Sequence, residues 1–94
     1  MGASRTLVYT SQFCGYCHAA IRLLTERGIE HEVIDVTHDP DSRARMVALA
    51  GGRKTVPQIF IDGRAIGGYM ELSGLDRSGE LREILGDGAG DESA

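Results

Sequence analysis

A strand, a helix and a second strand follow one another within residues 5–36, and this order constrains the fold more than any other feature. Arg5–Thr10 and His31–Val36 have the β-branched and aromatic content of strands. Between them, apolar residues recur at helical spacing over Cys14–Leu24, and Gly28 stands where a glycine would end the helix. Two strands joined by a helix must run parallel, so the chain begins with a βαβ unit.

The second half of the chain predicts a helix, a hairpin and two further helical segments. A helix is expected from Asp39-Pro40, a favoured cap and first position, to Gly51-Gly52. Asp62-Gly63 is a favoured two-residue turn between two short apolar runs. Helices are expected over Tyr69–Ser78 and around residues 81–85. The prediction is an α/β fold in which a βαβ unit and an antiparallel hairpin form a four-stranded mixed sheet flanked by helices, in two or three layers.

Charge and length exclude several classes of protein. The 94 residues carry 10 basic and 14 acidic side chains, and three of the acids lie in residues 86–94. We expect one domain over residues 1–85, near neutral, and a disordered acidic, glycine-rich tail over 86–94. The near-neutral charge of this domain argues against nucleic acid or an anionic membrane as the partner. No run approaches the ~20 apolar residues of a membrane span, and no secretory signal is evident, so a cytoplasmic location is expected.

The only two cysteines, Cys14 and Cys17, lie where a helix is predicted to begin. Unpaired N–H groups and a partial positive charge at a helix start favour a thiolate over a thiol. Cys14, at the exposed end, is therefore the predicted nucleophile. Cys17 lies one turn later on the same face, where it could attack a mixed disulfide on Cys14 and release the bound group.

Three other interpretations of the pair are weaker. Buried structural cysteines are rarely three residues apart at a helix start. A structural zinc site needs four ligands, and none of His18, His31 and His38 has finger-like spacing to the pair. Residues 14–18 match the C-x-x-C-H pattern of haem attachment, but that attachment belongs to exported proteins. His18 is interpreted as a partly exposed helix residue.

Two further segments are candidates for binding a ligand. Pro57 in Thr55-Val56-Pro57 either precedes a strand that begins after it or follows a cis peptide bond that turns the backbone groups of Val56 outward. In the second case an extended peptide could pair with Val56 as a strand would. Gly67-Gly68 is either a hinge or a close approach for a ligand whose carboxylate rests on the following helix. Both alternatives remain open from the sequence.

Taken together, these motifs resemble those of the glutaredoxins, a family of the thioredoxin-fold superfamily. The matching segments are Tyr9-Thr10, Cys14-Gly15-Tyr16-Cys17, Thr55–Ile61 and Ile66–Tyr69. They occur in register from about Leu7 to Leu85, and small bacterial dithiol members are the most similar. The resemblance implies a thioredoxin fold and a glutathione-dependent oxidoreductase that reduces protein and glutathione mixed disulfides. It also implies a monomer that takes its electrons from glutathione.

The resemblance assigns roles to individual residues. Cys14 would carry the glutathionyl group and Cys17 would resolve it. The glutathione-binding residues would be Tyr16, Arg53, Lys54, Thr55, Val56, Pro57, Gly68, Met70 and Glu71. Tyr16 would flank the glutathione sulfur, residues 55–56 would pair with the tripeptide backbone, and residues 53–54 would attract the glycyl carboxylate. The turn over residues 68–71 would hold the γ-glutamyl end.

Three departures from the family pattern change these expectations. Ser11 replaces a frequent lysine, and Met70-Glu71 replaces the usual Asp-Asp, so we expect weaker binding of glutathione. Gly15 replaces the usual proline of the motif. In some members this change accompanies a [2Fe-2S] cluster, held between two protomers by two nucleophilic cysteines and two glutathione thiols. The alternative function is therefore a cluster carrier or sensor that dimerises through Cys14; a redoxin served by a flavoprotein reductase is a third.

Overall fold

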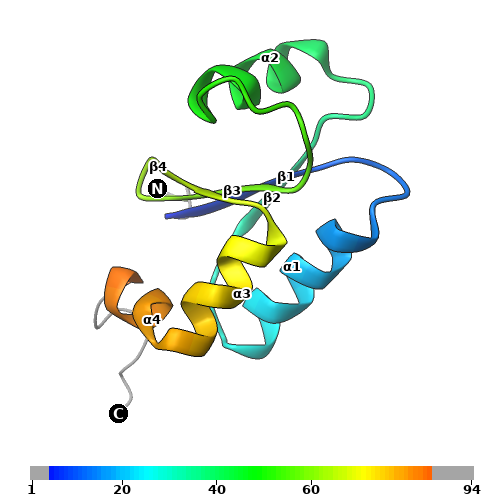
Figure 1. The fold of residues 1–94 in the computed structure, drawn as a ribbon. Helices are drawn as coiled ribbons and strands as arrows, with labels where there is room; N and C mark the ends of the chain where they lie inside the picture. Colours follow the sequence, from blue (N-terminus) through cyan, green and yellow to red (C-terminus); the bar gives the residue numbers. More distant parts are fainter. Residues whose placement is uncertain (1–4, 86–94) are drawn as a thin grey trace.

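The computed structural model describes residues 5–85, and its elements follow the predicted order (Figure 1). They are β1 (Thr6–Thr10), α1 (Gly15–Glu26), β2 (Glu32–Asp35), α2 (Pro40–Leu49), β3 (Gln58–Ile61), β4 (Arg64–Gly67), α3 (Tyr69–Ser78) and α4 (Glu80–Leu85). The ends of several elements differ from the prediction by one or two residues. His31, for example, precedes β2, and its ring Nδ1 lies 2.8 Å from the carbonyl oxygen of Ile29. The predicted tail, residues 86–94, lies outside the described residues.

The four strands form one mixed sheet in the order β2-β1-β3-β4. β1 is parallel to β2 and antiparallel to β3, and β3 is antiparallel to β4. This arrangement confirms the predicted fold, a βαβ unit extended by a hairpin. Both residues of the hairpin turn, Asp62 (φ 53°) and Gly63 (φ 81°), have the positive φ that a tight turn of this kind requires.

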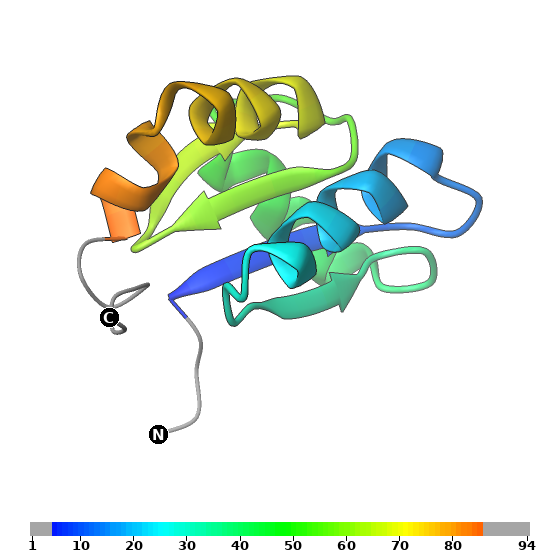
Figure 2. The ribbon, with the colours of Figure 1, turned by 90° about the horizontal axis from the view of Figure 1, so that it is seen from below.

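Helices cover both faces of the sheet, so the molecule has three layers. α2 lies on one face, whereas α1, α3 and α4 lie on the other (Figures 1 and 2). Each interface has its own buried cluster. The larger cluster contains Val8, Ala20, Leu23, Leu24, Ile29, Ile59, Ile61, Leu72, Leu81 and Leu85. The smaller one, which includes Met46 of α2, contains Tyr9, Val36, Met46, Ala50 and Phe60.

The two central strands contribute to both clusters because successive side chains point to opposite faces. Val8 belongs to the larger cluster and Tyr9 to the smaller, and Ile59 and Phe60 divide in the same way. The Tyr9 and Phe60 rings meet edge to face with centroids 5.5 Å apart. β1 and β3 therefore form a rigid base for the loops at their ends. Within residues 5–85, no helix has the length and apolar content needed to cross a bilayer.

Candidate active site around the cysteine pair

Cys14 caps the N-terminus of α1. Its backbone is extended (φ −115°, ψ 104°), and its Sγ accepts a hydrogen bond from the backbone N–H of Cys17 at 3.1 Å. The two sulfurs form a disulfide, with the Cα atoms 5.2 Å apart. The helix thus begins at the predicted place and directs one of its free N–H groups at the Cys14 sulfur.

The two cysteines differ in their accessibility. Cys17, in the first turn of α1, is 1% exposed, whereas Cys14 is only half-buried. A thiol or disulfide from solution can therefore reach the Cys14 sulfur but not that of Cys17. Cys17 is positioned to react with a group already attached to Cys14. His18 is exposed, as interpreted from the sequence.

The Val56-Pro57 peptide bond is cis, as the second interpretation expects, and β3 also begins directly after Pro57, as the first expects. The carbonyl oxygen of Val56 lies 3.8 Å from the Cys14 Sγ, although the two residues are 42 positions apart. Val56 is half-buried, and Thr55 and Lys54 before it are exposed. The segment before β3 therefore borders the reactive sulfur with backbone polar groups.

Gln58 holds this segment in place, and the sequence analysis gave it no role. Its side chain is fully buried, and its Nε2 donates to the carbonyl oxygen (3.0 Å) and to the Oγ1 (3.2 Å) of Thr55. These bonds pair the buried Nε2, and an unpaired polar group in the core is costly; the Oε1 of the same amide has no partner among the described residues. In the sequence, this role could have been suspected from a polar residue at the start of an otherwise apolar strand.

The start of α3 forms another side of the site, where the Glu71 side chain caps the helix. The N–H of Gly68 donates to Glu71 Oε1 at 2.8 Å, and Arg53 Nη2 lies 4.0 Å from the same oxygen. The Gly68 N–H and, less strongly, the Arg53 guanidinium hold the pKa of the Glu71 carboxyl below its ordinary value. Gly67 has no room for a side chain, since a Cβ there would lie 2.9 Å from Glu71 Cγ. The structure thus brings Arg53, Gly68 and Glu71 together.

Aromatic and apolar side chains are exposed near the cysteines. The rings of Tyr16 and Tyr69 stack with centroids 6.0 Å apart, which links the first turns of α1 and α3. Tyr16 is 63% exposed, Met70 65% and Phe13 97%. Phe13 had no predicted role, and its only signal in the sequence is that an apolar residue directly precedes the capping cysteine.

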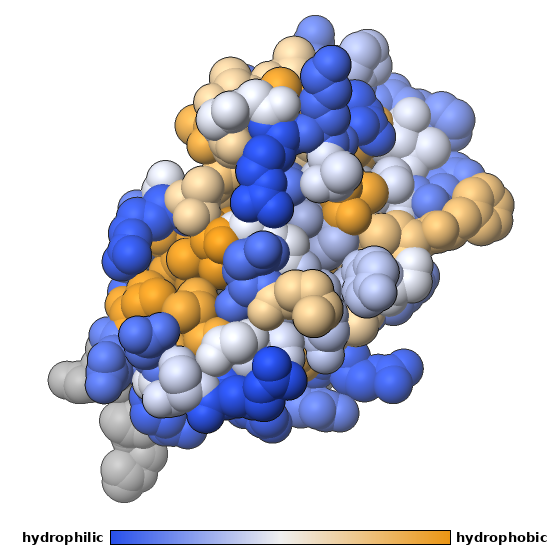
Figure 3. All heavy atoms as spheres, in the orientation of Figure 1, coloured by the Kyte–Doolittle hydropathy of each residue, from blue (hydrophilic) through white to orange (hydrophobic). Residues whose placement is uncertain are grey.

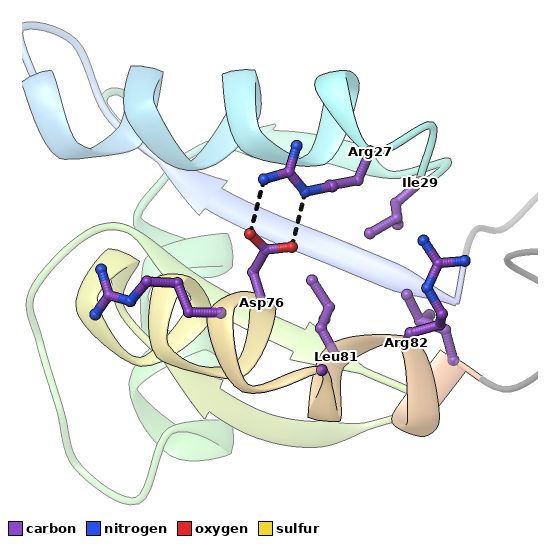
Figure 4. Close-up of a pocket in the computed structure, with 8 residues that line it drawn as sticks. Arg27, Ile29, Asp76, Leu81 and Arg82 are labelled. Atoms are coloured by element: carbon purple, nitrogen blue, oxygen red, sulfur yellow. Dashed lines mark hydrogen bonds and ion pairs between the residues drawn. The ribbon is translucent and has the colours of Figure 1, made fainter.

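A cavity of about 380 Å³ lies at the far end of α1 (Figure 4). Its lining residues are Arg27, Ile29, Asp76, Arg77, Gly79, Leu81, Arg82 and Leu85. Arg27, the C-cap of α1, donates two hydrogen bonds to the Asp76 carboxylate at 2.8 and 2.9 Å. A helix of 12 residues spans about 18 Å, so this cavity is separate from the cysteine site.

Comparisons with known proteins agree with the geometry. A model of the glutaredoxin family matches residues 6–66. The chain is 40% identical to glutaredoxin 3 of Escherichia coli K12 over 78 residues, which are 83% of this chain and 93% of that protein. It is 37% identical to a probable glutaredoxin of Synechocystis, over 83% of this chain and 89% of the relative.

Solved structures show the same similarity. A buckwheat glutaredoxin–glutathione complex has a TM-score of 0.77 at 31% identity, covering 87% of this chain and 76% of that one. The holo form of poplar glutaredoxin C1 has a TM-score of 0.79 at 31% identity, covering 95% and 82%. The chain is thus similar to these proteins in both sequence and fold.

Proposed function

The chain belongs to the glutaredoxin family, and on this premise we propose that it is a glutathione-dependent thiol–disulfide oxidoreductase that reduces protein and glutathione mixed disulfides. The observation that carries the proposal is the unequal exposure of the two sulfurs at the start of α1. Cys14 is half-buried at a helix N-terminus, whereas Cys17 is 1% exposed. That difference assigns attack to Cys14 and resolution to Cys17.

Reduction of a glutathionylated protein needs only Cys14. Its thiolate attacks the glutathione sulfur of the mixed disulfide, a Cys14–glutathione disulfide forms, and the protein thiolate leaves and takes up a proton. The thiolate of a free glutathione then attacks the glutathione sulfur bound to Cys14. Oxidised glutathione is released and the Cys14 thiolate returns. In sum, the protein mixed disulfide is reduced by two electrons to a protein thiol. The incoming glutathione and the glutathionyl group together form oxidised glutathione.

Reduction of a protein disulfide uses both cysteines. Cys14 attacks one sulfur of the substrate and the other substrate sulfur leaves as a thiolate. The Cys17 thiolate then attacks the Cys14 sulfur, which releases the second substrate thiolate and forms the Cys14–Cys17 disulfide. Two glutathione molecules reduce that disulfide and become oxidised glutathione. The pair supports this route because its Cα atoms lie at a separation that a disulfide accommodates.

Two walls of the site support glutathione as the ligand. The backbone of Val56 borders the Cys14 sulfur and offers strand-like pairing to a tripeptide. The first turn of α3, near Gly68 and Met70, offers N–H groups to a carboxylate. Arg53 and Glu71 would meet the charged ends of the ligand, but they pair with each other at 4.0 Å. The pair has to open when glutathione binds, and its half-exposed side chains make that inexpensive.

The proposal is tested by trapping the intermediate. The Cys17→Ser variant, incubated with oxidised glutathione, should gain the mass of one glutathionyl group, and peptide mapping should place it on Cys14. The adduct should persist because no resolving thiol remains. Cys14→Ser is the matched control and should gain no such adduct, since Cys17 is buried. A Cys17→Ser protein that stays unmodified would contradict the proposal.

A [2Fe-2S] cluster has less support from this structure. Such a cluster takes four ligands, usually thiolates, and the chain contains two cysteines. Residues 5–85 also contain no group of three or more His, Cys, Asp or Glu side chains that could hold a metal ion. These counts concern a cluster within one chain, whereas the alternative takes only Cys14 from each of two protomers and its other two ligands from glutathione. The oxidoreductase is the function that the geometry favours, because the half-buried Cys14 and the buried Cys17 have separate uses in disulfide exchange.

A further inference from the structure

The side chain of Phe13 gains no stabilising burial in the folded chain. Its side chain is 97% exposed, and its backbone has a φ of 58°, in the left-handed region. A bulky residue rarely adopts this conformation, because Cβ crowds the backbone there. An exposed ring gains no burial to offset that cost. An outlier of this kind, next to a reactive group, points to a role in function.

The loop that holds Phe13 is fixed rather than loose. The N–H of Gln12 donates to Thr37 Oγ1 at 2.8 Å, and Thr37 in turn donates its own N–H to Asp35 Oδ1 at 2.8 Å. On the other side, Cys14 is fixed as the cap of α1. The backbone of Phe13 thus lies between two anchored neighbours, and its side chain extends into solvent.

The loop also lies beside the reactive sulfur, at an apolar edge of the molecule. It projects from the body where α1 begins (Figure 1), and its tip carries apolar atoms (Figure 3). Phe13 directly precedes Cys14, so their Cα atoms are about 3.8 Å apart. Tyr16 and Met70, at the first turns of α1 and α3, are further large side chains that are exposed.

We infer that Phe13 is a docking residue for polypeptide substrates, whose apolar side chains next to the modified cysteine pack on its ring. The inference rests on the proposed function and adds a substrate preference to it. The small polar glutathionyl group is served by Val56 and the start of α3, so it has no need of a ring on the projecting loop. A protein substrate extends beyond its sulfur, and its neighbouring residues can reach Phe13 while Cys14 attacks.

Two glutathionylated decapeptides test this preference. In one, leucine flanks the modified cysteine on both sides; in the other, serine takes both positions. The wild-type chain should reduce the leucine peptide with a kcat/KM about tenfold higher than that of the serine peptide, a difference of about 1.4 kcal/mol. Phe13→Asn removes the ring and suits a left-handed backbone. This variant should lose the preference and retain the wild-type rate on the serine peptide.

Leu49→Asn is the matched control, because Leu49 is another exposed apolar residue, 50% exposed at the end of α2 on the opposite face of the sheet from α1. It should retain the preference for leucine. Equal wild-type rates on the two peptides would overturn the inference, and so would equal losses on both in Phe13→Asn. A wild-type chain that reduces neither peptide would instead overturn the proposed function, and the inference with it.

Discussion

At the scale of the residue, the carboxylate of Glu71 combines a structural contact with a proposed functional one. Its Oε1 accepts a hydrogen bond from the Gly68 N–H and so caps α3, while its charge is proposed to meet the γ-glutamyl end of glutathione, which carries an amine. The two contributions can be separated, because glutamine also completes a capping box but carries no charge. The structural contribution depends on an acceptor oxygen, and the binding contribution depends on a negative charge.

Glu71→Gln should therefore retain most of the stability and lose affinity for glutathione. Glu71→Ala should lose the same affinity and, in addition, about 1 kcal/mol of the free energy of unfolding, as expected for a lost helix cap. Urea unfolding and the KM for glutathione measure the two effects. A Glu71→Gln variant that binds glutathione as well as the wild type would contradict the assigned contact.

At the scale of the element, the start of α1 suits a proline at position 15. Gly15 is the first residue of the helix, where the missing N–H of a proline has no cost. A Cβ at Gly15 would meet no atom within 4 Å, and the extended backbone of Cys14 is compatible with a following proline. The N–H that contacts the Cys14 sulfur belongs to Cys17, so this contact remains.

Gly15→Pro should consequently raise the free energy of unfolding by about 0.4–1 kcal/mol through a less flexible unfolded chain. Gly74→Pro is the contrasting variant, because Gly74 lies inside α3 and also has no atom near a Cβ. It should lose about 3 kcal/mol or more. Thermal or urea unfolding of the oxidised proteins compares them. A destabilised Gly15→Pro would show that the turn needs glycine for a reason other than space.

At the scale of the whole molecule, ion pairs and caps connect distant elements through carboxylates. Asp62 receives two hydrogen bonds from Arg5, which join the start of β1 to the hairpin turn, and Asp76 joins α3 to the end of α1 through Arg27. Such contacts lower the pKa values of several carboxyl groups. The affected residues are Asp35, Asp39, Asp62, Glu71 and Asp76.

Acid should therefore destabilise the protein. A carboxyl group whose pKa is lower in the folded state stabilises the fold above its unfolded pKa, and this stabilisation is lost as the pH falls through the folded value. The urea midpoint should stay nearly constant from about pH 7 to 5 and fall below about pH 4. Asp76→Asn should lower the midpoint at pH 7 and have less effect at pH 3. A midpoint that rises on acidification would contradict this account.

The sequence predicted the elements well because their signals are local. Helix and strand periodicities involve residues a few positions apart, and the Asp62-Gly63 turn and the Gly79 stop of α3 depend on the backbone preferences of single residues. The position of the cysteine pair at the start of α1 is local in the same sense. It could therefore be read before any tertiary contact was known.

The rest of the site depends on contacts between segments far apart in the chain. Whether Val56-Pro57 is cis or trans is decided by the surrounding structure, since the two isomers differ little in intrinsic free energy. The proximity of Val56 to Cys14 exists only after β3 pairs with β1. The pairing of Arg53 with Glu71, the exposure of Phe13 and the three-layer packing likewise have no local signal. The sequence by itself determined the elements and the reactive pair, because these follow from neighbouring residues; the folded chain decided which groups surround the sulfur, because that follows from packing.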